Sequence, residues 1–218
     1  MAVYDRFASI YQRGPYIRFS QRLAESVLPE YLADLGIAPK ELLDVACGEG
    51  SFAILMSRQG YRVTGVDQSQ PMIDLALERA CKEKAAVSFL VEDMRSLEFK
   101  NEFDLVTCVF DSLNYMLTIK DLQAAFQCAY QALRPGGFYI FDMNTIYGLA
   151  VDWMREATYI QNETADFIEI HRQAFDYENQ IATMHITVFK QKGGLWERFE
   201  ETHLERGYPI ADIQFLLN

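Results

Sequence analysis

Metal-ligating and disulfide-forming residues are scarce in this sequence. It contains three histidines and four cysteines in 218 residues, and no two cysteines have the Cys-x-x-Cys spacing typical of zinc and thiol redox sites. No histidine stands at ligand spacing from another. We therefore expect no metal ion, and free thiols favour a reducing, cytoplasmic compartment.

Long apolar runs and basic patches are also missing. No apolar stretch approaches the roughly 20 residues that a membrane span requires, and the first twenty residues carry four charges, so we expect neither a membrane span nor a signal peptide. The formal net charge of −11 argues against a nucleic-acid partner, because a phosphate backbone needs a basic surface. The acidic residues are spread along the chain and are typical of solvated surface.

Strands and helices alternate regularly as far as about Asn144. With 50% hydrophobic residues the chain can bury one sizeable core. The alternation predicts an α/β fold with a doubly wound, mostly parallel sheet and right-handed crossovers. The expected strands are 41–46, 62–67, 87–92, 103–110 and 138–143, and the expected helices are 51–59, 70–84 and 121–133. A leading helical segment is expected over 4–35, interrupted near 14–15.

After Asn144 the pattern changes to long runs of β-forming and polar residues. The runs 163–174, 180–190 and 195–206 are separated by turn signals and predict an antiparallel meander inserted after the fifth strand. Residues 211–218 are expected to begin a helix. The buried face of the meander is expected to contain Ile168, Ile170, Ile181, Met184, Ile186, Val188, Phe199 and His203.

A glycine-bracketed turn joins the first expected strand to the helix that begins at Ser51. Gly48 and Gly50 permit a tight turn with positive φ and a close approach of a ligand, and the amides at the start of the helix favour an anion. Asp67, at the end of the next expected strand, is placed to accept hydrogen bonds from two ribose hydroxyls. The combination predicts a site for a cofactor that contains adenosine.

Two classes of cofactor fit this turn. Residues 48–53 satisfy the G-x-G-x-x-A fingerprint, so Asp67 can equally hold the ribose of a nicotinamide cofactor. An NAD(P)-linked oxidoreductase is therefore one interpretation of the residues.

Five segments in order resemble the class I S-adenosylmethionine (SAM)-dependent methyltransferases. They are Asp-Val-Ala-Cys-Gly-Glu-Gly at 44–50, Val-Asp-Gln-Ser at 66–69, Val-Glu-Asp-Met-Arg at 91–95, and the segments 103–108 and 133–138. Nicotinamide enzymes have no reason to carry the Asp93-Met94 pair or the Pro-Gly-Gly before the fifth strand. The resemblance implies a Rossmann-like core and an enzyme that transfers a methyl group from SAM to N or O of a small-molecule acceptor. A catalytically silent SAM-binding module is a second alternative.

The resemblance also implies which residues contact SAM. Asp44 would orient the turn or face the ammonium group, Asp93 with the backbone of Met94 would hold the adenine edge, and Met72 would cover an adenine face or belong to the core. The full set of implied cofactor residues is Tyr4, Tyr11, Arg18, Asp44, Ala46, Gly48, Gly50, Asp67, Gln68, Met72, Asp93, Met94 and Phe110.

The opening Tyr-x-x-Phe-Ala-x-x-Tyr at 4–11 and the meander resemble small-molecule methyltransferases, including amino-sugar N-methyltransferases. The likeness implies an N-terminal helical cap at 1–36, a SAM-binding core at 37–146 and 207–218, and a β lid at 147–206 through which two copies can meet as a homodimer. The family sheet is completed by two more strands after the final helix. The chain stops before them, and we expect a fragment.

The catalytic candidates follow the ends of the fourth and fifth strands. Tyr115 and Asp111 are the residues expected to take a proton from the acceptor, with Asn144 as a third candidate. The amino-sugar enzymes tend to carry a histidine after the fourth strand where this chain has Tyr115, so their base cannot be carried over. The histidines of the meander are more often structural, although one on its inner face can reach the substrate.

Overall fold

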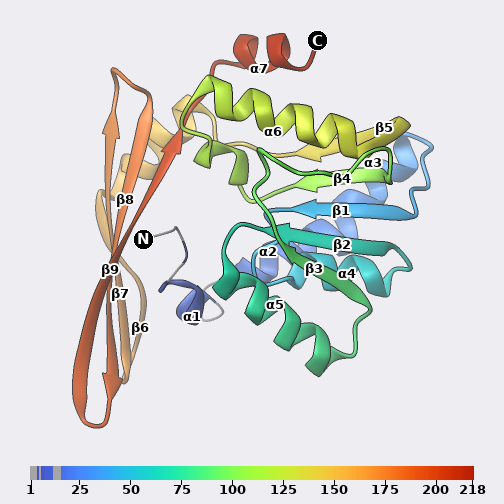
Figure 1. Ribbon diagram of the computed structural model, residues 1–218. Coiled ribbons are helices and arrows are strands. Elements are labelled where there is room, and N and C mark those ends of the chain that lie inside the picture. Colours follow the sequence, from blue (N-terminus) through green and yellow to red (C-terminus); the bar gives the residue numbers. More distant parts are fainter. Residues whose placement is uncertain (1–3, 5, 12–15) are drawn as a thin grey trace.

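The computed structural model describes residues 4, 6–11 and 16–218 and contains two separate sheets (Figure 1). The strands of the first sheet are β1 (Glu41–Val45), β2 (Arg62–Asp67), β3 (Val87–Val91), β4 (Phe103–Cys108) and β5 (Leu133–Phe141). They pair in parallel in the order β3-β2-β1-β4-β5. The predicted α/β fold with a parallel sheet is confirmed.

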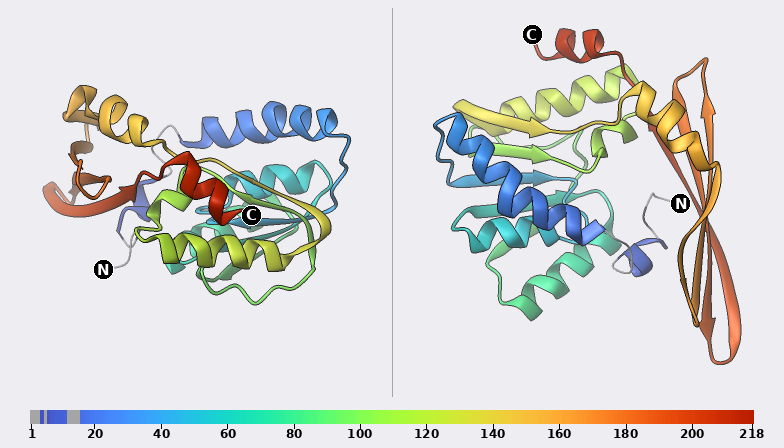
Figure 2. Two further views of the ribbon diagram at one scale, coloured as in Figure 1. Left: turned by 90° about the horizontal axis from the view of Figure 1, so that it is seen from above. Right: turned by 180° about the vertical axis from the view of Figure 1, so that it is seen from behind.

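Helices cover both faces of the parallel sheet, as Figure 2 makes visible. They are α2 (Tyr16–Arg22), η1 (Leu23–Val27), α3 (Leu28–Asp34), α4 (Ser51–Arg58), α5 (Gln70–Glu83) and α6 (Ile119–Ala132). Because successive side chains of a strand point to opposite faces, Leu42 of β1 packs with η1, α3, α4 and α5, whereas Leu43 packs with α6. The sheet is therefore doubly wound around two apolar layers.

The second sheet is antiparallel and stands beside the carboxyl ends of the parallel strands (Figure 1). Its strands are β6 (Thr158–Thr164), β7 (Phe167–Asp176), β8 (Ile181–Lys192) and β9 (Leu195–Arg206), preceded by η3 (Gly148–Asp152) and η4 (Trp153–Glu156). The insertion after the fifth strand is confirmed, but the single run expected at 163–174 is divided between β6 and β7. A register shift between Ile160 and Asn162 breaks the alternation of β6, which explains why the sequence pattern hid this strand.

One face of the antiparallel sheet, here called the inner face, packs against α1 (Ala8–Tyr11). The register places Glu169 opposite Val188, and Val188 opposite Phe199. The prediction for Met184, Ile186, Val188, Phe199 and His203 is confirmed, since they share this face with Glu169 and His171. The prediction for Ile168, Ile170 and Ile181 was wrong, because they lie on the opposite face. Phe167, Glu169 and His171 occupy the buried positions of β7, and Ala182, next to Ile181, is the buried residue at the start of β8.

Several element boundaries differ from the expected ones for local reasons. The fourth strand ends at Cys108 because Phe110 has a φ of +62°. The fifth begins at Leu133, five residues early, and includes the Pro-Gly-Gly segment. The helix expected from 211 is α7 (Ile210–Leu216). The interruption expected near 14–15 lies outside the described residues.

Candidate functional site

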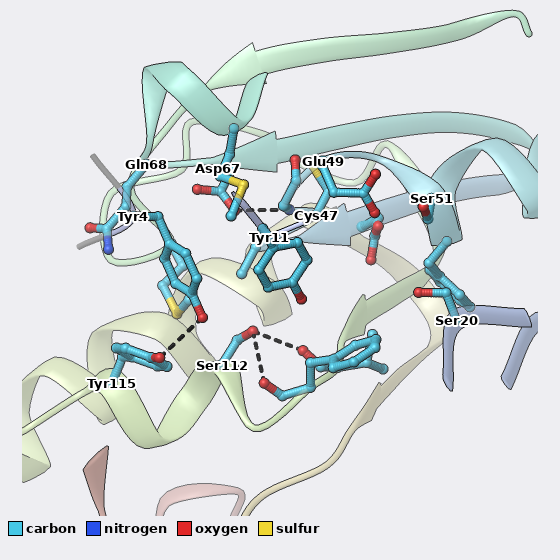
Figure 3. Close-up of a pocket in the computed structure, with 18 of the residues that line it drawn as sticks. Tyr4, Tyr11, Ser20, Cys47, Glu49, Ser51, Asp67, Gln68, Ser112 and Tyr115 are labelled. Carbon is cyan, nitrogen blue, oxygen red and sulfur yellow. Dashed lines mark hydrogen bonds between the residues drawn. The ribbon is translucent and has the colours of Figure 1, made fainter. Parts of the chain in front are cut away.

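A pocket lies where the carboxyl ends of β1, β2, β3 and β4 approach the N-terminal residues (Figure 3), and its empty space, including the part open to solvent, is about 900 Å³. The predicted cofactor residues that line it are Tyr4, Tyr11, Asp44, Ala46, Gly48, Asp67, Gln68, Met72, Met94 and Phe110. The catalytic candidate Tyr115 also lines the pocket. The other lining residues were not among the predicted cofactor contacts; they are Ser20, Cys47, Glu49, Ser51, Phe52, Glu92, Val109, Ser112 and Met116.

The two glycines of the turn after β1 have different roles. Gly48 has a φ of +55°, and a Cβ added there would meet no atom within 4 Å, so the backbone stays open to a ligand. Gly50 has a φ of +80° and caps α4, and a Cβ there would lie 2.7 Å from Phe89 Cζ and 2.9 Å from Ala76 Cβ. Gly50, which is not among the described residues that line the pocket, is thus required for packing under the turn.

Asp67 ties the turn to the end of β2. Its Oδ2 accepts a hydrogen bond from the Gly48 amide and its Oδ1 one from the Ser69 amide, both at 2.9 Å. Burial raises the pKa of this carboxyl despite the two amides. Each carboxylate oxygen keeps capacity for a further donor, which fits the two hydroxyls of a ribose.

The floor of the pocket is acidic. Asp44 is fully buried, accepts a hydrogen bond of 2.9 Å from Thr107 Oγ1, and has its pKa raised to about 7 by desolvation. Glu49, a further lining acid, forms an ion pair of 2.5 Å with Arg79. Among the described lining residues there is no lysine, arginine or histidine. A buried carboxyl without a cationic partner fits a ligand that brings positive charge, and SAM carries a sulfonium and an ammonium group.

The opposite wall is aromatic. The hydroxyls of Tyr4 and Tyr115 lie 3.1 Å apart (Figure 3), and Tyr115 also contacts His203 Nδ1 at 2.9 Å. Burial and the charge of Glu205 raise the pKa of Tyr115 well above its usual value, so its hydroxyl stays protonated. Tyr115 therefore presents a neutral hydroxyl to the pocket.

Glu201 of β9 fastens the N-terminal residues over the pocket. Its Oε1 accepts a hydrogen bond of 2.6 Å from the Tyr4 amide, and its Oε2 accepts bonds of 3.1 and 3.0 Å from the amides of Arg6 and Phe7. Phe7 and Ile10 pack on the apolar part of the inner face. The antiparallel sheet thus positions two of the tyrosines that line the pocket.

Asp111, the second catalytic candidate, lies beside the pocket in a group of acids. Asn144 Nδ2 donates to Asp111 Oδ2 at 2.5 Å and to Glu205 Oε2 at 3.0 Å. Burial, followed by the charge of Asp142, raises the pKa of Asp111. Burial and the charge of Asp111 likewise raise the pKa of Glu205, although the shared Asn144 amide acts in the opposite direction.

Arg18 and Asp93 are not among the described residues that line the pocket. Arg18 is exposed on α2. The Asp93 carboxylate is bonded to Arg95 Nε at 2.9 and 3.1 Å, and the Arg95 hydrogen bond lowers its pKa. Its neighbour Glu92 lines the pocket instead, and the position of Glu92 directly after β3 was the signal that the sequence offered for it.

No helix in the described part of the chain is long and apolar enough to cross a membrane. Within residues 4, 6–11 and 16–218 no group of three or more histidine, cysteine or acidic side chains is arranged to hold a metal ion.

The chain is similar in sequence to known methyltransferases. Residues 42–137 match the methyltransferase domain family. The putative methyltransferase YqeM of Bacillus subtilis is 29% identical over 221 residues, which cover 99% of this chain and 84% of that protein. The ubiquinone biosynthesis O-methyltransferase of Coxiella burnetii is 26% identical over 158 residues, covering 72% of this chain and 63% of that protein.

Solved structures agree with this family. A crystal structure of a SAM-dependent methyltransferase from Clostridium acetobutylicum has a TM-score of 0.82 and 27% identity, covering 98% of this chain and 85% of that one. CalS10, an amino pentose methyltransferase from Micromonospora echinaspora, shares the fold with a TM-score of 0.75 at 19% identity, covering 95% and 86% of the two chains. None of these matches supports the nicotinamide alternative. The matched domain, the similarity over nearly the whole chain and the acidic pocket agree with the ordered motifs, and the chain is a SAM-dependent methyltransferase with a Rossmann-like core.

Proposed function

We propose that this enzyme methylates a nitrogen or oxygen of a small-molecule acceptor that enters beside Tyr115. The observation that carries the proposal is a single pocket with an acidic floor for the cofactor and a wall of tyrosines beyond it. A relative that acts on small molecules, the ubiquinone biosynthesis O-methyltransferase, supports the acceptor class.

The residues of the acidic floor would hold SAM. Asp67 would accept the ribose hydroxyls, Asp44 would face the positively charged end, and Met72 and Met94 would pack on the adenine. SAM supplies an activated methyl group on its sulfonium when it is bound. The protein then has to align the acceptor and exclude water, and alignment of this kind contributes about 7–11 kcal/mol.

The lining also restricts the charge of the acceptor. Because the described lining residues include no cationic side chain, the pocket offers no partner for a phosphate or carboxylate close to the reacting atom. The acceptor is therefore neutral or cationic near the atom that is methylated.

The division into a cap at 1–36, a core at 37–146 with 207–218 and a lid at 147–206 belongs to the same proposal. In it, the antiparallel sheet acts as the lid that closes the acceptor side. A cytoplasmic location and a homodimer formed through that sheet stay predictions, which fractionation of cells and light scattering would test.

Calorimetric titration with SAM and with its demethylated product S-adenosylhomocysteine tests the cofactor site. Asp67→Asn should weaken binding about 10- to 100-fold, since one hydrogen bond to a charged acceptor contributes about 1.5–3 kcal/mol. Asp74→Asn, on the exposed side of α5, is the control and should bind as the wild type does. Mass spectrometry of a panel of amines, phenols and alcohols incubated with SAM then tests methyl transfer. Failure to bind either nucleoside overturns the proposal, and binding without turnover on any acceptor favours the silent module.

A further inference from the structure

The inner face of the antiparallel sheet carries the same Glu-x-His arrangement twice. On β9, His203 Nε2 lies 3.1 Å from Glu201 Oε1, and on β7, His171 Nε2 lies 2.6 Å from Glu169 Oε1. Each histidine also contacts a tyrosine hydroxyl through Nδ1. All four Glu and His side chains are buried.

The two sets differ in where the tyrosine lies. His203 Nδ1 is 2.9 Å from the hydroxyl of Tyr115, which lines the pocket. His171 Nδ1 is 3.1 Å from the hydroxyl of Tyr159, which belongs to β6 and is not among the described lining residues. The same set of glutamate, histidine and tyrosine therefore occurs twice, once in contact with a residue that lines the pocket and once without such a contact.

The contacts of the set behind the pocket favour one tautomer of His203. Burial favours the neutral form of Glu201, but hydrogen bonds from His203 and from the amides of Phe7 and Tyr4 outweigh it and lower its pKa. The nearest acceptor to His203 Nε2 is thus a carboxylate, at ion-pair distance though not aligned as a good hydrogen bond. This charge favours the tautomer with the proton on Nε2, in which Nδ1 accepts from the protonated hydroxyl of Tyr115.

We propose that His203, oriented by Glu201, receives through the Tyr115 hydroxyl the proton that the methyl acceptor releases. This inference rests on the proposed function and deepens it. The bond that forms joins the acceptor atom to the methyl carbon, and the bond that breaks leaves its electron pair on sulfur. The acceptor proton passes to Tyr115 Oη while the Tyr115 proton passes to His203 Nδ1, which leaves an imidazolium beside the Glu201 carboxylate. The acceptor therefore bears an N–H or O–H at the reacting atom.

The surroundings of His203 suit this role. The Tyr4 ring lies with its centroid 4.8 Å from the imidazole at an interplanar angle of 81°, and the Phe7 ring lies at 5.7 Å. These rings exclude water from the imidazole. The charged or titratable groups that face it are Glu201 from its own strand and Tyr4 and Tyr115 from the other elements, with Glu205 acting on Tyr115. Glu201 is therefore the counter-charge that stabilises the imidazolium.

The protonation pattern is measurable without any acceptor. The chain has three histidines, so ¹⁵N-histidine labelling of the full chain with S-adenosylhomocysteine bound gives three imidazole spin systems. We expect His203 as the Nε2–H tautomer at neutral pH, with a large shift of its Nδ1 signal in Tyr115→Phe. Tyr159→Phe is the matched control and should move the His171 signals instead. An Nδ1–H tautomer at His203, or no shift in Tyr115→Phe, overturns the proposal.

The second test measures kcat with the acceptor that the wild type methylates among the amines, phenols and alcohols named under the proposed function. His203→Gln should lower kcat about 100-fold, within the usual range for proton transfer, and the deficit should narrow as pH rises because hydroxide replaces the base. His171→Gln removes the equivalent buried group and should leave kcat within a factor of about two. Equal kcat in the two variants overturns the proposal even though the enzyme methylates.

The two arms separate the inference from the proposed function. Calorimetry with S-adenosylhomocysteine should give the same affinity in His203→Gln as in the wild type. If the wild type itself does not bind the nucleoside, the proposed function fails, and the result does not bear on His203. If His203→Gln does not fold, Tyr115→Phe takes its place in the kinetic arm. If the panel yields no acceptor, the tautomer measurement decides the proposal by itself.

Discussion

Glu201→Gln should release the N-terminal residues from the pocket. The Arg6 and Phe7 amides both donate to Oε2 of Glu201, and a glutamine that places its NH₂ there can accept neither of them. At about 1.5 kcal/mol for each charge-assisted bond, two lost bonds cost about 3 kcal/mol. The ratio of open to closed segment should then rise about 100-fold.

Hydrogen exchange followed by mass spectrometry measures this ratio directly. With S-adenosylhomocysteine bound, the amides of Tyr4, Arg6 and Phe7 should exchange about 100 times faster in the variant than in the wild type. Affinity for the nucleoside should fall as well, because Tyr4 and Tyr11 line its pocket.

Two glutamine variants separate this effect from general loosening. Glu200→Gln makes the same charge change next to Glu201, on the exposed side of β9. Glu169→Gln disturbs the other buried Glu-His pair of the inner face. Unchanged exchange in Glu201→Gln, or equally fast exchange in Glu169→Gln, would refute the assignment of the anchor to Glu201.

Three further predictions concern packing and titration. Gly65→Ala should destabilise the fold by about 1–3 kcal/mol in urea unfolding, because its Cβ would lie 2.7 Å from the Phe89 ring and 3.0 Å from Cys47 Sγ. A variant as stable as the wild type would contradict this prediction. The pKa of Glu205 in the folded protein is raised above its ordinary value of 4.5, so the stability of the wild type should fall as pH rises above that value. Glu205→Gln should flatten this decline and be more stable than the wild type near pH 8. Parallel curves of unfolding free energy against pH for the two proteins would contradict the prediction. Affinity for SAM should rise as pH increases through about 7, because the cationic ligand binds best to ionised Asp44. Asp44→Asn should remove this pH dependence, and an equal slope of affinity against pH in the variant would contradict the prediction.

Much of the lining of the proposed cofactor site was predictable because its signals are local. Gly48 and Met94 lie three residues after the ends of β1 and β3, Asp67 is the last residue of β2, and the carboxyl ends of neighbouring parallel strands meet at one edge. A strand recognised by its apolar run therefore places the residues around its carboxyl end. Asp93 follows β3 in the same way but is not among the described lining residues, and its carboxylate pairs with Arg95, a contact that no local sequence pattern predicts.

The acceptor half depends on contacts between distant segments and was only partly predictable. Glu201 and His203 are two residues apart, so strand geometry alone puts them on one face, and the same holds for Glu169 and His171. The predicted buried face of β7 was wrong, because isoleucine is buried far more often than glutamate or histidine. The Glu and His become suitable for burial only as a pair that satisfies its own polar atoms.

The difference between the two Glu-x-His sets lies outside the sheet that carries them. His203 and His171 have the same partner at the same spacing, so neither local sequence nor burial distinguishes a proton acceptor from a structural pair. The short helix after β4, η2 (Ser112–Tyr115), distinguishes them. It places Tyr115, which is 88 residues from His203 in the chain, against both His203 and the pocket. A function for such a pair can therefore be inferred only where a third group connects it to the space in which the reaction occurs.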